Sequence, residues 1–472
     1  MPARHHRLTR AGSAVAVGQT YPAPVGDVLL GDNFYGYYDA AKGAIRLQEV
    51  INDVNYPMWD ITGVAPTTAA DTRGVTWTID RRSNKIAYVG VDGAVHVVSA
   101  YTGIDLPSRL SVPDSTTPSS FAANGGGARW EGRWWLSKPA ASWQVTLKSA
   151  TTGAVLRTWQ GGETRSAVRV SWDGRAQAGG TLVPNGSYTW TLTAVPADGS
   201  RATLSTSGTV KVTGAAAVRR DLAGSDGIGD LLTLDSSGSL TIQKGDGAGA
   251  YSGKVSGSGW ATSVRAVPVG DLNGDRCNDV LVRFSSGTLR GYRPGCGKAV
   301  TTSTPYTSLG TGFNQYDVLT SPGDVTGDGR ADLIARDSST HTVYLYKATS
   351  SGKLSSRVKL YADWSGYKKI VGAGDLGGDG HGDLLVQDKS NELWRYNGTG
   401  SGTFKSRVKV FDDWGSSYDV VVGVGDITGD AKADLVSRDT AGTLWRNAGD
   451  GKGSFGGRTK VATGWGGYKG VF

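Results

Sequence analysis

The chain has 472 residues, of which 38% are hydrophobic and 19% are charged, and its formal net charge is +8 at pH 7. This composition is ordinary for a soluble globular protein and argues against a disordered chain, and the length allows two to four domains. No apolar stretch reaches the roughly 18 residues of a membrane-spanning helix, so we expect no membrane span. Glycine, with 71 residues, is about twice as frequent as usual, which favours tight turns and short strands over helices.

The basic residues are scattered along predicted strands rather than gathered in one run, as at Arg357, Lys359, Arg407 and Lys409. A solvated basic surface therefore fits this pattern better than a nucleic-acid site, and we expect no nucleic-acid partner. Long-range attraction favours acidic polymers, such as extracellular glycans, as partners.

Residues 1–24, MPARHHRLTRAGSAVAVGQTYPAP, combine a basic start with the short and weakly apolar stretch AGSAVAVG. A secretory signal peptide has a longer and more apolar central region, so a signal peptide is not clearly present. We expect a flexible basic N-terminus here. Because other features point to an extracellular protein, the true start of the gene is expected to lie upstream.

Residues 25–118 contain the strand-like runs YGYYD, AIRLQEV, VTWTID and KIAYVGVDGAVHVVSA, with a hairpin turn at Asp92-Gly93. These runs predict a β-meander that forms one or two propeller-like blades. Two arrangements remain open. The blades are either the remnant of a larger N-terminal propeller or additional members of the C-terminal repeat array.

Residues 119–214 contain the runs WQVTLK, VLRTWQ, AVRVSW, YTWTLTAV and GTVKV, separated by Gly, Asp and Pro turns. About seven short strands in a segment of this length predict an Ig-like β-sandwich. The stretch WDGRAQAGGTLVPNGSYTWTLTA resembles the Ig-like domain of flagellar hook-capping proteins through Trp172, Asp173, Gly174, Pro184, Gly186 and Tyr188. The resemblance implies a spacer or docking domain.

Residues 215–472 contain a repeated aspartate-rich stretch that is followed each time by an apolar run. The clear copies are GDLNGDRCNDVLVRF from Gly270, GDVTGDGRADLIARD from Gly323, GDLGGDGHGDLLVQD from Gly374 and GDITGDAKADLVSRD from Gly425, with a looser copy, RDLAGSDGIGDLLTLD, from Arg220. The first aspartates recur at intervals of 50 to 53 residues, and so does an aromatic series: Trp260, Phe313, Trp364, Trp414 and Trp465. Repeats of this length with several short strands predict a β-propeller with one blade per repeat.

The fourth copy illustrates the four strands of a blade, namely YKKIVGAGD, DLLVQD, ELWRYN and SRVKVF. The aspartate stretches resemble the FG-GAP/VCBS repeats of integrin-type β-propellers, and the resemblance covers residues 215–472. Such propellers commonly have about seven blades, whereas five copies are legible here, so blade number and closure stay open. The final stretch YKGVF corresponds to YKKIV and is predicted to complete a terminal blade.

Counted from the first aspartate, the stretches share a pattern of Asp at positions 1, 5 and 9, an oxygen-bearing residue at 3 and Gly at 6, from which the fourth copy departs with Gly377 at position 3 and the fifth with Ala431 at position 6. Hard oxygen ligands at this spacing converge on one cation, which predicts several structural Ca²⁺ ions rather than Mg²⁺ with its strict octahedral geometry. No glutamate stands at position 12, so these are not EF-hands. The alternative is an Asp/Gly turn whose carboxylates accept backbone amide hydrogens.

The predicted calcium ligands are side-chain oxygens and, at position 7, a backbone carbonyl. They are Asp271, Asn273, Asp275, Cys277 and Asp279 in the second copy, Asp324, Thr326, Asp328, Arg330 and Asp332 in the third, Asp375, Asp379, His381 and Asp383 in the fourth, and Asp426, Thr428, Asp430, Lys432 and Asp434 in the fifth. The first copy, with Asp221, Ser225, Asp226 and Asp230, has one residue too many and is expected to bind more weakly. The last aspartates, Asp235, Asp337, Asp388 and Asp439, are expected to cap the next turn.

Two other sets of residues within residues 215–472 have predicted roles. Cys277 and Cys296 are predicted to form a disulfide that closes a hairpin, worth about 3 kcal/mol in an oxidising compartment; the alternative is two reduced thiols. Trp364, Trp414 and Trp465, each followed by a tyrosine, are expected to wedge between blades, and the alternative is that they stack on sugar rings as ligand-binding residues.

The sequence contains no metalloprotease, nucleophile-elbow, phosphate-loop or serine-protease motif, and its five histidines show no catalytic spacing. We therefore name no catalytic residue. The pattern favours a secreted, calcium-stabilised binding or adhesion protein that presents a propeller surface to a glycan or an extracellular protein. The alternatives are a polysaccharide lyase or hydrolase on a propeller scaffold and a structural part of a surface assembly.

Overall fold

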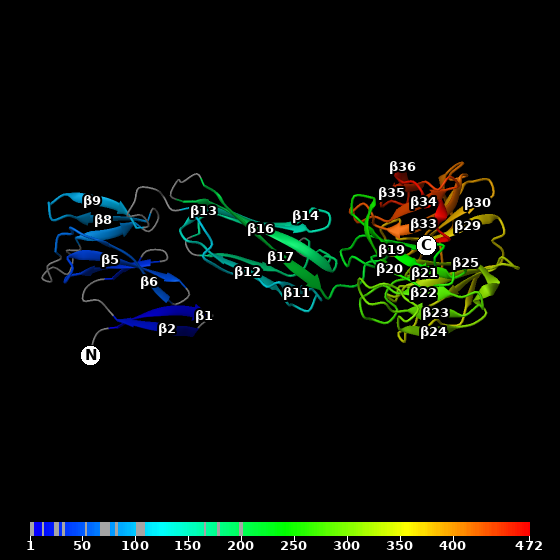
Figure 1. The fold of residues 1–472 in the computed structure, drawn as a ribbon, viewed down its shortest axis with the longest axis horizontal. Coiled ribbons are helices and arrows are strands. Elements are labelled where there is room, and N and C mark those ends of the chain that lie inside the picture. The colour runs from blue at the N-terminus through cyan, green and yellow to red at the C-terminus, as the bar shows by residue number, and fades with distance from the viewer. Residues whose placement is uncertain are drawn as a thin grey trace.

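The computed structural model describes residues 4–11, 14–22, 28–30, 34–51, 54–66, 76–80, 84–100, 109–164, 167–176, 180–197 and 202–472. In these residues the fold is almost entirely β, and the helical segments are two single 3₁₀ turns, η1 (Phe313–Gln315) and η2 (Trp465–Gly467). No helix in this part of the chain has the length and apolarity to cross a bilayer. Figure 1 shows three parts along the long axis: N-terminal sheets, a sandwich and a propeller.

The N-terminal part contains one hairpin and two small antiparallel sheets. The hairpin pairs β1 (Arg4–Ala11) with β2 (Ala14–Pro22), so these two stretches are paired strands and not the flexible segment that we expected, whereas residues 1–3, 12–13 and 23–24 lie outside the described residues. The first sheet consists of β3 (Val28–Leu30), β4 (Phe34–Asp39), β5 (Ala44–Ile51) and β6 (Val54–Ile61), and the second of β7 (Trp77–Asp80), β8 (Lys85–Val89) and β9 (Val95–Ser99).

A small core that includes Phe34, Ile45, Trp77 and Ile86 joins these two N-terminal sheets. The predicted turn between β8 and β9 is present, and Gly93 in that turn has the positive φ of 77° that favours glycine. Figure 1 shows both sheets at the opposite end of the molecule from the propeller. They therefore do not join the C-terminal ring of blades, because the sandwich lies between them.

The central part is a two-sheet β-sandwich, as predicted. One sheet orders β10 (Asp114–Thr116), β12 (Trp130–Trp135) and β15 (Ala167–Trp172), and the other orders β11 (Ser120–Ala122), β17 (Leu204–Thr213), β16 (Gly186–Pro196), β13 (Ala140–Ser149) and β14 (Val155–Gly161). Alternate residues of these strands point inward, and Trp130, Trp134 and Trp172 fill the core between the sheets. The five strand-like runs of the sequence correspond to β13 through β17.

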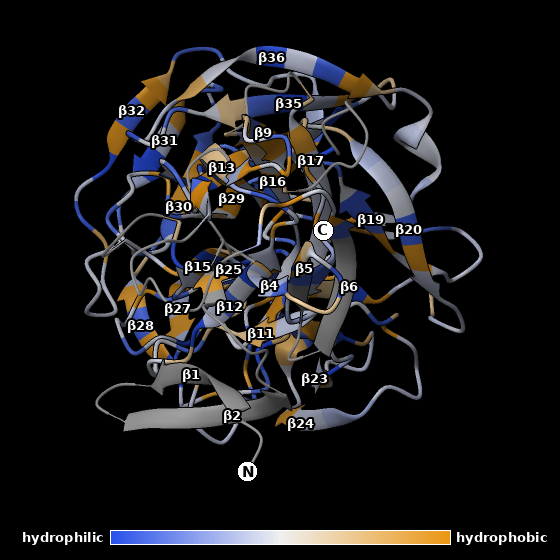
Figure 2. Ribbon diagram, turned by 90° about the vertical axis from the view of Figure 1, so that its left-hand side faces the viewer, coloured by the Kyte–Doolittle hydropathy of each residue, from blue (hydrophilic) through white to orange (hydrophobic). Residues whose placement is uncertain are grey.

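The C-terminal part contains five four-stranded antiparallel sheets, which we call blades 1 to 5. From the innermost to the outermost strand they comprise β37 (Gly470–Val471), β18 (Leu231–Leu234), β19 (Leu240–Gly245) and β20 (Tyr251–Gly257) in blade 1; β21 (Arg265–Pro268), β22 (Val280–Arg283), β23 (Leu289–Tyr292) and β24 (Tyr306–Gly310) in blade 2; β25 (Tyr316–Gly323), β26 (Asp332–Asp337), β27 (Val343–Tyr346) and β28 (Val358–Tyr361) in blade 3; β29 (Tyr367–Gly374), β30 (Asp383–Asp388), β31 (Leu393–Tyr396) and β32 (Val408–Phe411) in blade 4; and β33 (Tyr418–Gly425), β34 (Asp434–Asp439), β35 (Leu444–Gly449) and β36 (Phe455–Ala462) in blade 5. In Figure 2 the outermost strands β24, β28, β32, β36 and β20 follow one another around the perimeter.

The blades are held together by apolar cores between neighbours. Adjacent residues of a second strand point to opposite faces of the blade, so Leu384 of β30 packs toward blade 3 while Leu385 packs toward blade 5. This explains why the second strands read as continuous apolar runs. The same arrangement joins blade 5 to blade 1, where Val436 and Leu231 share a core. Because every blade contacts two neighbours, the five sheets form a closed propeller.

The ring closes through a strand from the end of the repeat array. β37 pairs antiparallel with β18, with Thr233 opposite Val471 and Leu234 opposite Gly470. The amide of Phe472 also donates a hydrogen bond to the carbonyl of Leu232 at 2.8 Å. The predicted role of the YKGVF stretch is therefore confirmed, because it supplies the innermost strand that the first repeat lacks.

Two arginines before the first repeat fill the axis of the ring. Arg219 donates from Nη2 to the carbonyls of Ser321 (2.7 Å) and Gly372 (3.0 Å), and Arg220 donates from Nε to the carbonyl of Gly423 (2.9 Å). These carbonyls belong to the inner strands of blades 3, 4 and 5. Burial lowers the pKa of Arg219 to about 10 and that of Arg220 to about 9, so both remain charged at neutral pH.

We expect Val471→Ala to lower the free energy of unfolding of the propeller by about 1 to 2 kcal/mol, because the buried side chain that closes the ring is shortened and a cavity remains. The matched control is Val408→Ala on the outermost strand β32, where the side chain is largely exposed and the change should stay below about 0.5 kcal/mol. Calorimetry of thermal unfolding separates the propeller transition from that of the sandwich, and denaturant unfolding gives the free energies of unfolding. Equal effects of the two substitutions would contradict the closing role of β37.

Candidate functional site

In blades 2 to 5 the aspartate-rich stretches form loops 2 to 5, which connect the innermost strand of the blade to its second strand, and in blade 1 the corresponding loop 1 joins the linker from the sandwich to β18. In each loop the position-1 aspartate accepts backbone amide hydrogens from the residues that follow it. Asp324, for example, accepts from Gly327 at 2.7 Å through Oδ1 and from Gly329 at 2.6 Å through Oδ2. The turn alternative is therefore part of the geometry, and these carboxylates fold the loop around themselves.

Position 6 of the loops has a left-handed backbone whatever its side chain. Gly329 and Gly380 have φ values of 81° and 85°, as expected for glycine, but Arg276 and Ala431 adopt φ values of 67° and 65° at the same place. Sequence analysis missed that Arg276 departs from the glycine pattern. The surrounding hydrogen bonds impose the conformation, because the amides of Arg276 and Ala431 donate to Asp271 and Asp426 at 2.7 Å.

The position-9 aspartates are buried and join distant parts of each blade. Asp383 accepts from the amide of Leu376 in its own loop at 3.0 Å and from the amide of Gly398, after the third strand, at 2.9 Å. Asp332 and Asp434 make the equivalent pairs of hydrogen bonds. Burial raises the pKa of Asp332 and of Asp383 to about 6, because no opposite charge compensates the loss of solvent.

Blade 2 departs from this arrangement. Asp279 is 0% exposed, and its Oδ2 accepts from Leu272 at 2.9 Å. Its Oδ1 has no hydrogen-bond partner among the described residues, because the position that supplies the amide in the other blades is Pro294, which has no N–H. Burial accordingly raises the pKa of Asp279 to about 7.

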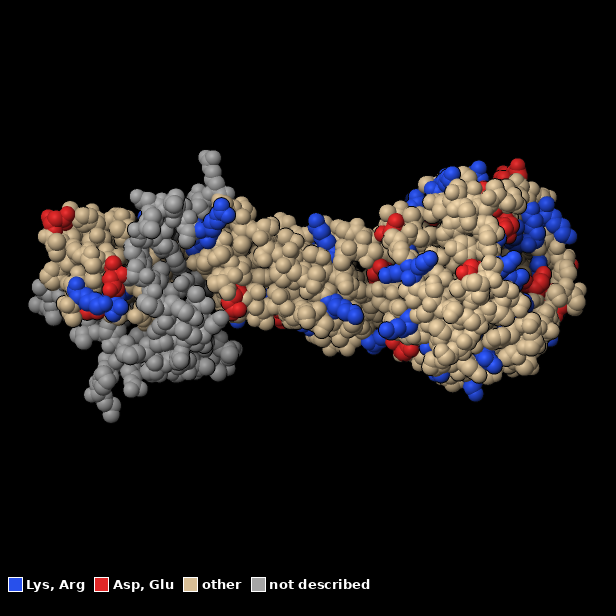
Figure 3. All heavy atoms as spheres, viewed as in Figure 1, with Lys and Arg blue, Asp and Glu red and all other residues tan. Residues whose placement is uncertain are grey.

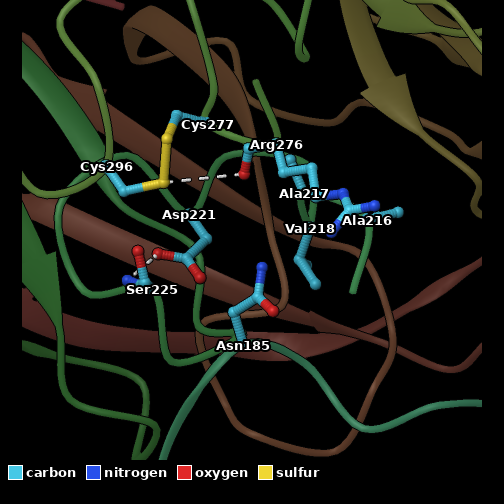
Figure 4. Close-up of a pocket in the computed structure, with 9 residues that line it drawn as sticks. All are labelled: Asn185, Ala216, Ala217, Val218, Asp221, Ser225, Arg276, Cys277 and Cys296. Atoms are coloured by element: carbon cyan, nitrogen blue, oxygen red, sulfur yellow. Dashed lines mark hydrogen bonds between the residues drawn. A yellow bond between two sulfur atoms is a disulfide. The ribbon is translucent and has the colours of Figure 1, made fainter. Parts of the chain in front are cut away.

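The predicted disulfide is present in the same blade. Cys277 and Cys296 form a bridge with a Cα–Cα distance of 4.8 Å. It ties loop 2 to the segment that follows Pro294, where the repeated hydrogen bond is missing. Figure 4 shows the bridge beside Ala216, Ala217 and Val218 of the linker from the sandwich.

The fifth loop has the side-chain arrangement that best fits a hard cation. Thr428 Oγ1 lies 3.1 Å from Asp430 Oδ1, 3.1 Å from Asp434 Oδ2 and 3.4 Å from Asp426 Oδ1. The oxygens of positions 1, 5 and 9 thus converge on position 3, and all of them are ligands that Ca²⁺ prefers. Nowhere in the described residues, however, are three or more Asp, Glu, His or Cys side chains arranged to hold a metal ion.

Basic side chains contact the position-5 aspartates in three loops. Arg330 lies 3.1 Å from Asp328, Lys432 lies 3.1 Å from Asp430, and Lys405 lies 3.7 Å from Asp379. Arg330 and Lys432 are two of the four position-7 residues whose carbonyls were predicted as ligands, and Cys277 and His381 are the other two. These exposed ion pairs are individually weak, so a divalent cation that binds the loop has little to displace.

The first loop, which carries an extra residue, contacts the sandwich. Asp226 accepts a hydrogen bond from Thr151 Oγ1 of the sandwich at 3.1 Å. Asp221 accepts from the amides of Ser225 at 2.7 Å and Gly227 at 2.8 Å, and Asp230 accepts from the amides of Leu222, Ala223 and Gly245. The loop that departs from the repeat is therefore the one that docks the propeller on the sandwich.

Residues of the hook-capping resemblance lie at this same contact. Tyr188 donates its hydroxyl to the carbonyl of Pro184 at 2.6 Å, which fixes the turn before β16. A Cβ on Gly186 would lie 2.8 Å from the carbonyl oxygen of Ser225, so the close approach of the two domains requires glycine there. Asn185 exchanges hydrogen bonds with the backbone of Ala215 in the linker.

A cleft of about 710 Å³ lies between the sandwich and loops 2, 3 and 4 of the propeller. Asn124 and Leu182 line it from the sandwich, and Arg219 lines it at the propeller axis. Its other polar groups come from the loops: Asp271, Asp324, Asp328, Asp375, Arg276, Arg330 and His381.

On the face shown in Figure 3, lysines and arginines are scattered over the propeller with acidic residues between them.

The repeated tryptophans lie at the junctions between blades, as predicted for wedges. Trp364 is 5% exposed and packs at 5.1 Å from Tyr367, so it offers no free face to a ligand and the stacking alternative does not fit it. Trp414 and Trp465 also contact the tyrosines that follow them, but both remain half-buried and reach the surface.

The last aspartate of each motif caps the next turn, as expected. Asp388 accepts from the amides of Ser390 and Glu392, both at 2.9 Å, and Asp439 accepts from those of Ala441 and Thr443. Sequence analysis missed a second task of these carboxylates, which is to accept the indole N–H of Trp394 at 2.9 Å and of Trp445 at 2.8 Å.

An outer-edge pairing of arginine with an aromatic ring was also missed. Arg357 lies over Tyr344, Arg407 over Trp394 and Arg458 over Trp445, at 4.3, 4.0 and 4.2 Å from the ring centroids. The signal was present in the sequence, because these arginines and aromatic residues recur with the period of the blades.

Comparisons with known proteins agree with this architecture. The model of the FlgD Ig-like domain matches residues 119–198, and that of the FG-GAP-like repeat matches residues 324–386. No curated protein matches the chain significantly in sequence.

Similar solved structures include three that are distant in sequence. A protein from Agrocybe aegerita, described as recognising non-reducing terminal N-acetylglucosamine, is 14% identical over 81% of this chain and 89% of its own, with a TM-score of 0.30. AofleA from Arthrobotrys oligospora is 11% identical over 74% and 95%, with a TM-score of 0.33, and the lectin BP39L from Burkholderia pseudomallei is 12% identical over 91% and 95%, with a TM-score of 0.29. At these scores the likeness does not identify a shared function.

The chain thus joins a FlgD Ig-like domain to a five-bladed β-propeller that contains an FG-GAP-like repeat.

Proposed function

We propose that this chain is a secreted, calcium-stabilised and non-catalytic binding protein whose propeller presents its surface to carbohydrate. The observation that carries the binding role is the repeated tryptophan at the blade junctions, which stays half-buried and accessible at Trp414 and Trp465. Aromatic side chains with one exposed face suit the C–H face of a sugar ring, and several weak sites on one scaffold add their affinities. The sandwich serves as a spacer that holds the propeller.

Calcium is proposed for loops 2 to 5, with the strongest support in the fifth loop, where three aspartates converge on Thr428. The same proposal names Asp271, Asp275 and Asp279 in loop 2, where Asp279 keeps a free buried oxygen for a ligand bond. When bound, the ion would supply the positive charge that these carboxylates, including the buried Asp279, lack. Its role is structural, because each site is closed by its own loop.

An extracellular location is proposed from the Cys277–Cys296 disulfide, which persists in oxidising compartments. The cleft at the propeller axis is lined by loop aspartates and arginines that already take part in turns and ion pairs. For this reason we prefer binding over catalysis.

Calcium should raise the melting temperature of the propeller, and EDTA should lower it. A site filled at about 100 times its dissociation constant adds about 2.7 kcal/mol. Asp379→Asn removes an exposed ligand of loop 4, so it should reduce the calcium-dependent gain while leaving the melting temperature in EDTA nearly unchanged. Asp412→Asn, at an exposed aspartate outside the loops, is the control. Identical melting curves in calcium and in EDTA would refute the calcium proposal.

The metal-free protein should lose stability as the pH rises from about 4 to about 6. The pKa values of Asp332 and Asp383 are raised to about 6 in the folded state, compared with about 3.9 in an unfolded chain. The folded state therefore holds more protons in this window, and the stability that is present below pH 4 is lost by pH 6. Denaturant titrations in EDTA at several pH values test this, and saturating calcium should remove the loss.

A glycan array provides the test of the binding role. We expect calcium-dependent binding to a limited set of glycans by the full chain. A purely structural role in a surface assembly predicts no binding to any glycan, so an array without signal at micromolar protein in the presence of calcium would rule out the carbohydrate proposal.

A further inference from the structure

Three of the five blade junctions are filled by a tyrosine from the last position of the third strand. The ring centroids of Tyr396 and Trp364 are 4.9 Å apart, and the hydroxyl of Tyr396 forms a hydrogen bond with the hydroxyl of Tyr367 at 2.8 Å. Tyr346 packs at 5.4 Å from Phe313 in the same way. Tyr292, at 5.1 Å from Trp260, occupies the corresponding place between blades 1 and 2. The tyrosine therefore completes the wedge at each of these junctions.

The junction between blades 4 and 5 has Asn447 at this position. The shorter side chain turns to the backbone, and its Nδ2 donates to the carbonyl of Gly456 at 3.0 Å. Asn447 is 4% exposed, yet its Oδ1 has no hydrogen-bond partner in the part of the chain that the structure describes. The hydroxyl of Tyr418 lacks the tyrosine partner found at the neighbouring junctions and contacts Arg458 Nη1 at 3.4 Å.

The fifth junction, between blades 5 and 1, is filled in a different way. Gln243 of blade 1 is long enough to reach the hydroxyl of Tyr468 at 3.4 Å. Tyr251 lies 6.0 Å from Trp465 and covers the same junction. Asn447 is thus an exception that no neighbouring side chain compensates among the described residues.

A second substitution of the repeat opens the same junction. Gly456 and Gly457 stand where blade 4 has Lys405 and Ser406, and a Cβ on Gly457 would meet no described atom within 4 Å. The result is a cavity of about 280 Å³ lined by Phe411 and Trp414 of blade 4 and by Asn447, Phe455 and Arg458 of blade 5.

The cavity combines an aromatic floor with a few polar groups, which is the composition of a small-molecule site. Trp414, Phe411 and Phe455 supply apolar surface. Asn447 Oδ1 is an unused acceptor, and the hydroxyl of Tyr418 and the guanidinium of Arg458 are donors. Arg458 is held in place by the ring of Trp445, 4.2 Å away.

We propose that this cavity binds a single neutral pyranose ring. Its volume lies just below the roughly 300 Å³ of the smallest ligand pockets, so it holds one ring rather than a chain. The ring would place its C–H face on Trp414 and its hydroxyls against Asn447, Tyr418 and Arg458. Asp413 and Arg458 give the lining one negative and one positive charge, so the cavity carries no net charge, which suits a neutral sugar. This inference rests on the proposed carbohydrate binding and assigns it to one junction.

The test replaces the exceptional residue with the one that its neighbours have. Asn447→Tyr should fill the cavity and give the Tyr418 hydroxyl its partner, so that affinity for neutral sugars falls at least tenfold while the melting temperature stays equal or rises. Gly457→Leu blocks the cavity from the other wall and should have the same effect on affinity. Tyr396→Asn, at the neighbouring junction between blades 3 and 4, is the matched control and should leave sugar binding in the cavity between blades 4 and 5 unchanged.

The probes are the methyl glycosides of common neutral hexopyranoses, measured with the full chain by ligand-observed NMR and calorimetry in calcium. Loss of binding in both Asn447→Tyr and Gly457→Leu, with binding kept in Tyr396→Asn, supports the assignment. Undiminished binding in the two blocked variants overturns this site but leaves the carbohydrate role in place. If the chain binds array glycans but no methyl glycoside, the proposal that the ligand is a single ring is wrong, while the proposed carbohydrate binding still holds. No binding to any glycan refutes the proposed function and this site together.

Discussion

Each blade of the propeller depends on one buried carboxylate. The position-9 aspartate accepts an amide from its own loop and another from the turn after the third strand, so it holds together segments that are about a third of a blade apart in sequence. A buried charge without an opposite charge is costly. The amides reduce that cost, and a cation at the loop would reduce it further. The same constraint therefore explains the shape of the blade, and it is the reason why we propose a cation among the other acidic residues of the loop.

Blade 2 shows what happens when this interaction is incomplete. Pro294 cannot donate to Asp279, and the disulfide between Cys277 and Cys296 joins the two segments that the hydrogen bond joins elsewhere. The first blade differs in another way, because its loop gives Asp226 to the sandwich. Departures from the repeat thus have identifiable physical reasons, and Asn447 belongs to the same group of informative exceptions.

Much of the architecture could be predicted from the sequence, because period-2 runs, turn residues and a repeat of regular length are local signals. Strands β29 to β32, the disulfide and the closing strand followed from these signals. The second partner of Asp383 could not be predicted, since Gly398 lies 15 residues away on another turn and no residue type marks it. The open junction at Asn447 was missed for a similar reason, because a vacancy between blades depends on which side chains meet across them. The calcium ligands of loops 2 to 5 remain a prediction.

The pairing of β37 with β18 has a consequence for biogenesis. Blade 1 receives its inner strand from residues 470–471, while its other strands begin at residue 231. Until those last residues are synthesised, β18 presents an unprotected edge and two apolar faces remain without a neighbour. Closure across about 240 residues is a slow, non-local event. The ring therefore closes only after residues 470–471 have been synthesised, and until then the unpaired edge of β18 can pair with a strand of another nascent copy.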